Sequence, residues 1–301
     1  LIYASATMFD ALLGLAVLAG VASLWRIGQG ASALRDWAWF GVALAFGVYA
    51  KGPVILVHLL PLLLTIRLWA PAPPTFKDAA KGFGFAFALA LGLVAFWLIP
   101  ALITASPEYR TELLWTQSAA RVAGGMAHDR PIWFLAALLP VNLFPWGWSW
   151  RLWSRISRTW RADPAARLCV IWGLSSLVLF SLISGKQVHY LLPAFPAMAL
   201  LFAFASKTED PRGGTLAWAP LLTFAAAAAA VASHVLAMPK DLADIAPMWP
   251  LLAFAGLMAV LALVVLILPN RPAHLLAGVG FTLGLHGLIV GTSLHATYDG
   301  Q

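Results

Sequence analysis

Polar side chains that could do chemistry are rare in this 301-residue chain, and most fall in short breaks between apolar blocks. One break is Lys51-Gly52-Pro53, where Pro53 can open a helix because a first-turn residue needs no N–H. A lysine beside the free N–H groups of a helix N-terminus forms an anion site suited to phosphate. The alternative is that Lys51 simply extends its ammonium group to the membrane interface.

A second break, Gly185-Lys186-Gln187-Val188-His189-Tyr190, places four hydrogen-bonding side chains within five positions between two apolar stretches. Such a density of donors predicts a cation-rich pocket for a phosphate or a sugar. The alternative is a short solvated hairpin.

The connection over residues 104–131 contains further polar side chains. An amphipathic segment beginning at Glu112 could lie in the plane of the lipid headgroups. The guanidinium groups of Arg121 and Arg130 match phosphate oxygens in pairs. His128 could ligate a metal or carry a proton. The alternative is an interfacial helix whose charged side chains are merely solvated.

Asp10 stands at the beginning of the first apolar block. A carboxylate at the border of a membrane is a functional candidate by default. The alternative is an acid that only complements the dipole of a helix N-terminus. Five other histidines lie apart from these breaks and are interpreted as structural: His58, His234, His274, His286 and His295.

The elements that must position these residues are transmembrane helices. Hydrophobic residues make up 61% of the chain, charged residues 10%, and the mean hydropathy is +0.84. Soluble domains have about 25% charged residues, and a helix needs about 20 apolar residues to cross a bilayer. We therefore predict an all-α, polytopic transmembrane helical bundle of about ten helices. The predicted spans are roughly 8–25, 37–50, 53–69, 82–103, 132–150, 168–184, 190–205, 216–238, 251–268 and 275–294.

Charge sets the expected orientation of these spans. Five arginines follow Trp150, and short loops rich in Lys and Arg stay in the cytoplasm. By alternation, Asp10, Lys51, the 104–131 connection and the 185–190 break all lie on the outer face.

The net charge of +7 arises from scattered residues without a basic stripe, so no nucleic-acid partner is expected. The single cysteine, Cys169, excludes a disulfide framework.

The polar residues also divide the chain. The last three predicted spans are almost free of them, so residues 1–205 are interpreted as the working core and 206–301 as structural helices.

No nucleotide-binding loop or catalytic-triad motif is present in the sequence. An outer-face anion site suits a lipid phosphate. A transporter or flippase for a lipid-linked anion is the alternative, although no paired repeats support it; a structural membrane subunit is a third.

Five groups of residues, in order, give the chain a resemblance to a known superfamily. It looks like the bacterial aminoarabinose transferase and dolichyl-phosphate-mannose protein mannosyltransferase superfamily, which are integral-membrane glycosyltransferases of the C type. The groups are Thr7-Met8-Phe9-Asp10-Ala11, Tyr49-Ala50-Lys51-Gly52-Pro53, Gln117 with Arg121, Ala127-His128-Asp129-Arg130-Pro131 and Lys186-Gln187-Val188-His189-Tyr190-Leu191-Leu192-Pro193.

The resemblance implies inverting transfer of a sugar from a polyprenyl-phosphate donor to an acceptor, at the outer face of the bacterial inner membrane. The acceptor could be lipid A, another glycolipid or a protein, and neither the sugar nor the carrier length is specified. It implies that Lys51, Arg121, Arg130 and Lys186 hold the donor phosphate. Gln117, His189 and Tyr190 would contact substrate. His128 would ligate a divalent metal, the one cofactor considered.

Relatives of this kind carry their general base in an outer loop, ahead of the helix that corresponds to the one at Asp10. This chain opens with Leu1 inside an apolar region. We therefore expect that the N-terminal helices and this loop are missing, that Asp10 is a supporting acid and that the chain alone is inactive.

Overall fold

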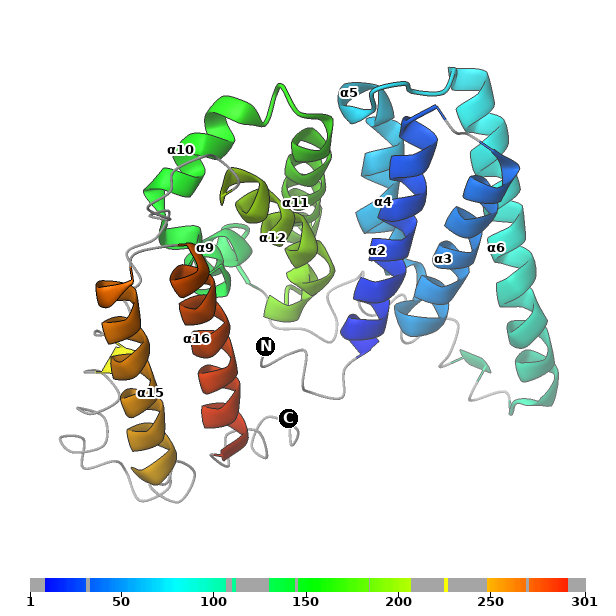
Figure 1. Ribbon diagram of the computed structural model, residues 1–301. Helices are drawn as coiled ribbons and strands as arrows, with labels where there is room; N and C mark the ends of the chain where they lie inside the picture. The colour runs from blue at the N-terminus through cyan, green and yellow to red at the C-terminus, as the bar shows by residue number, and fades with distance from the viewer. Residues whose placement is uncertain are drawn as a thin grey trace. The chain divides into compact units, whose positions relative to one another are not determined.

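The computed structural model describes most of the chain as helix. The described residues are 9–30, 33–106, 110–111, 130–143, 146–183, 185–206, 225–226, 248–268 and 271–291. Across these ranges there is no β-strand, and a single isolated bridge joins Gln29 to Ala72. The all-α prediction is confirmed (Figure 1).

The chain divides into two compact units. The larger comprises residues 9–144 and 155–204, and the smaller comprises residues 1–8, 145–154 and 205–301. The larger unit contains the α-helices α2 (Phe9–Gly28), α3 (Leu34–Lys51), α4 (Ile55–Leu64), α5 (Ile66–Trp69), α6 (Phe76–Thr104), α9 (Phe134–Asn142), α11 (Pro164–Leu182) and most of α12 (Phe195–Ser206). It also contains two 3-10 helices, η1 (Gly52–Val54) and η4 (Val188–Ala194).

Small residues allow α2, α3 and α4 to pack closely. A Cβ at Gly20 would clash with Leu59 of α4, and one at Gly28 would lie 2.8 Å from Trp69 Cζ3. Helix α4 with α5 therefore runs alongside α2 in the same direction. A Cβ at Gly47 of α3 would likewise clash with Ile55 of α4. These two residues are close in sequence, so the chain reverses direction between them, where Gly52 adopts a φ of +71°. Close approach through glycine is typical of helices packed in membranes.

Two ion pairs close the ends of the α2–α3 hairpin. At one end, Arg26 Nε of α2 lies 3.0 Å from Asp36 Oδ1 of α3. At the other, Asp10 of α2 faces Lys51 of α3. Asp36 lies in the first turn of α3, and Asp10 lies in the first turn of α2. Each carboxylate is therefore at a helix N-terminus, where the helix dipole favours a negative charge.

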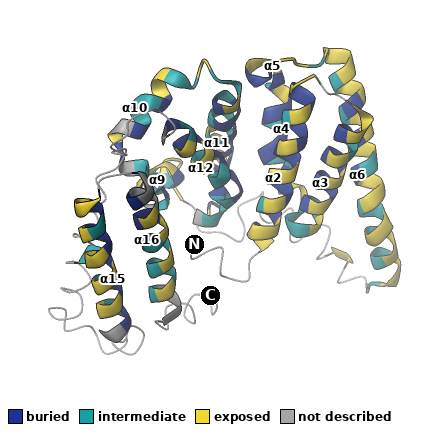
Figure 2. Ribbon diagram, viewed as in Figure 1, coloured by how far each residue is buried: buried dark blue, intermediate teal, exposed yellow. Residues whose placement is uncertain are grey.

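Helix α6 buries little of its surface. Only Gly82, Ala86 and Ala90 are buried along its 29 residues, and Ala86 packs against Gly41 of α3. Figure 2 shows the rest of the helix largely exposed. Phe96, for example, is 85% exposed. A long exposed apolar surface is a liability in water but the normal outer surface of a helix in lipid.

Five helical segments in the described ranges are long and apolar enough to cross a membrane, so the chain is a multi-pass membrane protein. They are Phe9–Gly28, Leu34–Leu64 (which includes the reversal at Gly52), Phe76–Thr104, Pro164–Leu182 and Pro250–Ile267, with shorter apolar helices at His189–Ala205 and Leu276–Leu288. The predicted span 132–150 is not one helix. It comprises nine-residue α9 with Pro140 inside it, the 3-10 helix η3 (Trp146–Trp148) and the beginning of α10 (Trp150–Thr159). The predicted span 216–238 lies almost entirely outside the described residues.

The smaller unit contains η3, the first half of α10, α15 (Met248–Ile267) and α16 (Arg271–Gly291). Helices α15 and α16 pack through Gly280 against Leu261 and Gly284 against Leu257. Their described residues are almost entirely apolar. The functional division at residue 205 stays a prediction.

Candidate active site

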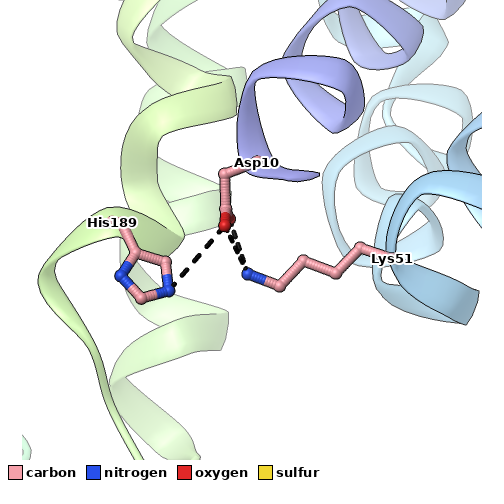
Figure 3. Close-up of polar contacts among 3 residues, drawn as sticks. All are labelled: Asp10, Lys51 and His189. Atoms are coloured by element: carbon pink, nitrogen blue, oxygen red, sulfur yellow. Dashed lines mark hydrogen bonds and ion pairs between the residues drawn. The ribbon is translucent and has the colours of Figure 1, made fainter. Parts of the chain in front are cut away.

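The centre of the candidate site is an ion pair between α2 and α3. Because the two helices are antiparallel, the first turn of α2 lies beside the last turn of α3. Lys51 Nζ donates to both carboxylate oxygens of Asp10, at 2.7 Å each (Figure 3). Asp10 is 3% exposed and Lys51 is half-buried. The sequence breaks at Asp10 and Lys51, 41 residues apart, therefore form one feature.

The 3-10 helix η4 brings His189 and Tyr190 to this pair. Its Pro193 Cα would lie 3.8 Å from a Cβ on Gly14, so η4 packs directly across α2. His189 Nε2 lies 3.8 Å from Asp10 Oδ2, and in Figure 3 its ring is to the left of the carboxylate while Lys51 is to the right. The Lys51 ammonium also faces the Tyr190 ring, 5.0 Å from its centroid, in a cation–π contact.

Burial makes the Asp10–Lys51 pair sensitive to the loss of either partner. A carboxylate taken out of water is tolerated when a counter-charge and hydrogen bonds compensate for lost solvation. Lys51 supplies both to Asp10, and the N-terminus of α2 adds its dipole. The pair consequently fixes the position of a cation whose flexible side chain would otherwise adopt many rotamers.

A second contact brings two more of the predicted cations together. Lys186 is 5% exposed, and its Nζ donates to the backbone carbonyl of Arg130 at 2.8 Å. Arg130 itself is exposed, with its guanidinium 4.3 Å above the ring of Phe134. Lys186 therefore ties the segment that precedes α9 to the 185–190 break.

One apolar cluster supports both contacts. Leu135, Phe180 and Leu191 form its buried centre, and Phe134 and Tyr190 pack against it. Phe134 lies under Arg130, and Tyr190 faces Lys51. The two polar contacts are thus attached to a common packed core within the larger unit.

Three of the predicted site residues, Gln117, Arg121 and His128, lie outside the described residues. The metal prediction rests on one of them, His128. In the described part of the chain, no group of three His, Cys, Asp or Glu side chains could hold a metal ion. Asp10 and His189 provide two possible ligands, but Lys51 already donates to both oxygens of Asp10. These residues do not fit a metal site.

Sequence reasoning missed the connection of His58 to this site. His58 and Ser176 are fully buried, and their Nδ1 and Oγ atoms lie 3.1 Å apart, joining α4 to α11. The His58 ring lies 5.1 Å from the ring of Phe180, which in turn lies 5.5 Å from the ring of Tyr190. A histidine inside a predicted membrane span was the available signal.

The sequence of this chain is similar to those of known proteins. No family model matches the chain. It is 31% identical over 188 residues to undecaprenyl phosphate-alpha-4-amino-4-deoxy-L-arabinose arabinosyl transferase 1 of Pseudomonas fluorescens (strain Pf0-1), covering 60% of this chain and 32% of the relative. The corresponding transferase of Pseudomonas aeruginosa (strain PAO1) is 30% identical over 203 residues, which cover 65% and 36%.

The fold is also similar to that of a solved structure. The crystal structure of ArnT from Cupriavidus metallidurans bound to undecaprenyl phosphate matches with a TM-score of 0.61 and 22% identity, covering 97% of this chain and 53% of that one. The chain thus resembles the aminoarabinose transferases in sequence and shares the fold of about half of the ArnT chain. It spans about a third of the length of the curated relatives it matches.

Proposed function

We propose that this chain, similar in sequence to arabinosyl transferases named for an undecaprenyl-phosphate sugar, forms the donor-binding membrane core of a glycosyltransferase. The reaction is transfer of a sugar from a polyprenyl-phosphate donor to a lipid or protein acceptor, with inversion at the sugar carbon. The observation that carries the proposal is the meeting of Asp10, Lys51, His189 and Tyr190 at one end of the helices.

The charge that develops in this reaction accounts for the cations. As an acceptor nucleophile bonds to the anomeric carbon, the bond from that carbon to the phosphate oxygen breaks, and polyprenyl phosphate leaves with both bonding electrons. Cations already held in place stabilise that growing charge without having to reorganise. Loss of one such contact typically lowers the rate by ~10²–10³.

The proposed roles of Asp10, Lys51, Arg130, Lys186, His189 and Tyr190 rest on their positions, and those of Gln117 and Arg121 rest on the resemblance to the transferases. Lys51 holds the departing phosphate, and Asp10 is the supporting acid that fixes its ammonium. Arg130 and Lys186, with Arg121, complete the phosphate site, and Lys186 also fixes the Arg130 backbone. Gln117, His189 and Tyr190 contact the substrate.

The proposed location is the bacterial inner membrane, with the site facing the extracytoplasmic side. The basic loops support this orientation, because Arg67, Lys77 and Lys81 lie around the α5–α6 connection, at the end of the bundle away from Asp10. The partners are then the lipid-linked donor, its acceptor and the surrounding lipids.

The test is sugar transfer in membranes containing the complete protein, from undecaprenyl-phosphate aminoarabinose to a lipid acceptor. Lys51→Ala is expected to lower transfer by ~10²-fold or more while the protein still inserts. Lys81→Ala, an exposed lysine at the opposite end of the helices, is the matched control and should transfer normally. Normal transfer by Lys51→Ala would overturn the site. If Lys51→Ala instead lost the movement of a lipid-linked anion across the membrane but kept sugar transfer, the transporter alternative would be favoured.

A further inference from the structure

We propose that the basic segment of residues 155–167 binds the phosphodiester headgroups of anionic phospholipids, at the end of the bundle away from Asp10. The segment comprises the second half of α10 and the beginning of α11. It carries Arg155, Arg158, Arg161 and Arg167 against one acid, Asp163. This proposal does not depend on the sugar-transfer reaction.

The single acid of the segment is already engaged. Asp163 Oδ1 accepts a hydrogen bond from the Ala166 amide at 2.8 Å, which caps the N-terminus of α11. Its charge therefore complements the helix end. The segment therefore carries four arginines against one acid, whose carboxylate is held at the helix end.

The described side chains present this charge at a surface. Arg158 of α10 and Arg161, just after the end of that helix, are exposed, whereas Ile156 of α10 is 6% exposed. Arg155 and Arg158 are three residues apart and share a face of α10. The helix therefore has a buried apolar side and a basic side, as amphipathic helices at membrane surfaces do.

Two further contacts are suited to the headgroup region. The Arg161 guanidinium lies 5.3 Å over the ring of Trp160, and tryptophan is enriched at this depth. Arg167 Nη1 donates to the Arg161 carbonyl at 2.8 Å, while its buried Nε has no hydrogen-bond partner among the described residues. Guanidinium groups match phosphodiester oxygens in pairs.

The position of the segment along α11 selects the ligand. Helix α11 is a candidate membrane span that begins at Pro164 beside the arginines and ends at Leu182, near the 185–190 break. The arginines therefore lie at the membrane surface on the side away from Lys51. An anionic lipid surface attracts each nearby arginine by about 1 kcal/mol, which corresponds to about a fivefold change in affinity.

The experiment uses the complete protein reconstituted in vesicles made of phosphatidylcholine and phosphatidylglycerol, at a chosen molar ratio of about three to one. After mild solubilisation, the ratio of the two lipids retained on the protein is measured by mass spectrometry. We expect enrichment of phosphatidylglycerol on the wild type, and a loss of about fivefold or more in Arg158→Gln/Arg161→Gln. The matched control, Lys77→Gln/Lys81→Gln, removes two exposed charges from α6, outside the segment, and should lose much less of the enrichment than the arginine variant.

Three further measurements do not require the glutamine variant to fold. Wild-type enrichment should fall in 0.5 M salt, because exposed charges are screened, but should persist in millimolar inorganic phosphate if a lipid headgroup is the ligand. Arg158→Lys/Arg161→Lys should retain most of it. The proposal would be overturned if the glutamine variant retained as much phosphatidylglycerol as the wild type. It would also be overturned if the control variant lost as much as the glutamine variant, or if salt did not change the enrichment.

Discussion

Lys51 Nζ lies 2.7 Å from each carboxylate oxygen of Asp10, across the antiparallel helices α2 and α3. The same lysine faces the ring of Tyr190 from η4. Three segments that are far apart in the sequence therefore fix one ammonium group at one end of the bundle. A cation held so firmly can stabilise charge on a bound phosphate without first being reoriented.

The Asp10–Lys51 pair should be strongly coupled in stability. Asp10→Asn or Lys51→Met alone leaves one buried charge without its partner and is expected to cost about 3 kcal/mol or more. The double variant leaves neither charge, so it should be closer to wild type than the sum of the single losses. Unfolding in mixed micelles measures the coupling, and strictly additive losses would contradict it.

Tyr190 should act on Lys51 through its ring. Tyr190→Phe retains the aromatic face and should keep most of the transfer activity, whereas Tyr190→Leu removes the cation–π contact. A contact worth about 1–2 kcal/mol corresponds to a loss of roughly 5- to 30-fold in transfer rate. Equal losses in the two variants would assign the role to the hydroxyl group instead.

Lys186 should hold the segment before α9 in place through the Arg130 carbonyl. Lys186→Met removes this donor and is expected to increase amide hydrogen exchange around Phe134, together with a loss of donor binding. Lys186→Arg retains a donor and should restore part of the exchange protection. Protection unchanged in Lys186→Met would show that the contact does not order this segment.

Packing at Gly28 should be far less tolerant than at Gly84. A Cβ at Gly28 meets Trp69 Cζ3 at 2.8 Å, and Trp69 is fully buried, with its indole donating to the Leu62 carbonyl at 2.9 Å. Overpacking of this kind costs typically 1–3 kcal/mol, so Gly28→Ala should lower the unfolding temperature. Gly84 has open space around it, and Gly84→Ala should be neutral or gain up to about 1 kcal/mol of helix propensity. Equal stability of the two variants would refute the close contact.

The sequence predicted the helices well where a long apolar run was bounded by polar residues, as at Lys51-Gly52-Pro53. It failed at 132–150, because an apolar window does not reveal that Pro140 and the Trp146–Trp148 turn divide the segment. Hydropathy and charge predicted that Asp10, Lys51 and His189 share one end of the bundle. They could not predict that Lys51 pairs with Asp10, since that depends on how α2 packs against α3. Nor could they predict that Lys186 donates to the Arg130 carbonyl, since that depends on where the segment before α9 meets the 185–190 break.

The most direct test of the central claim is binding of undecaprenyl phosphate to the reconstituted protein, compared between wild type, Lys51→Gln and the control Lys81→Gln. If Lys51 holds the donor phosphate, its loss should weaken binding by about tenfold or more, because a charged hydrogen bond is worth about 1.5–3 kcal/mol, and the control should bind as wild type. Equal affinity of Lys51→Gln and wild type would contradict the account.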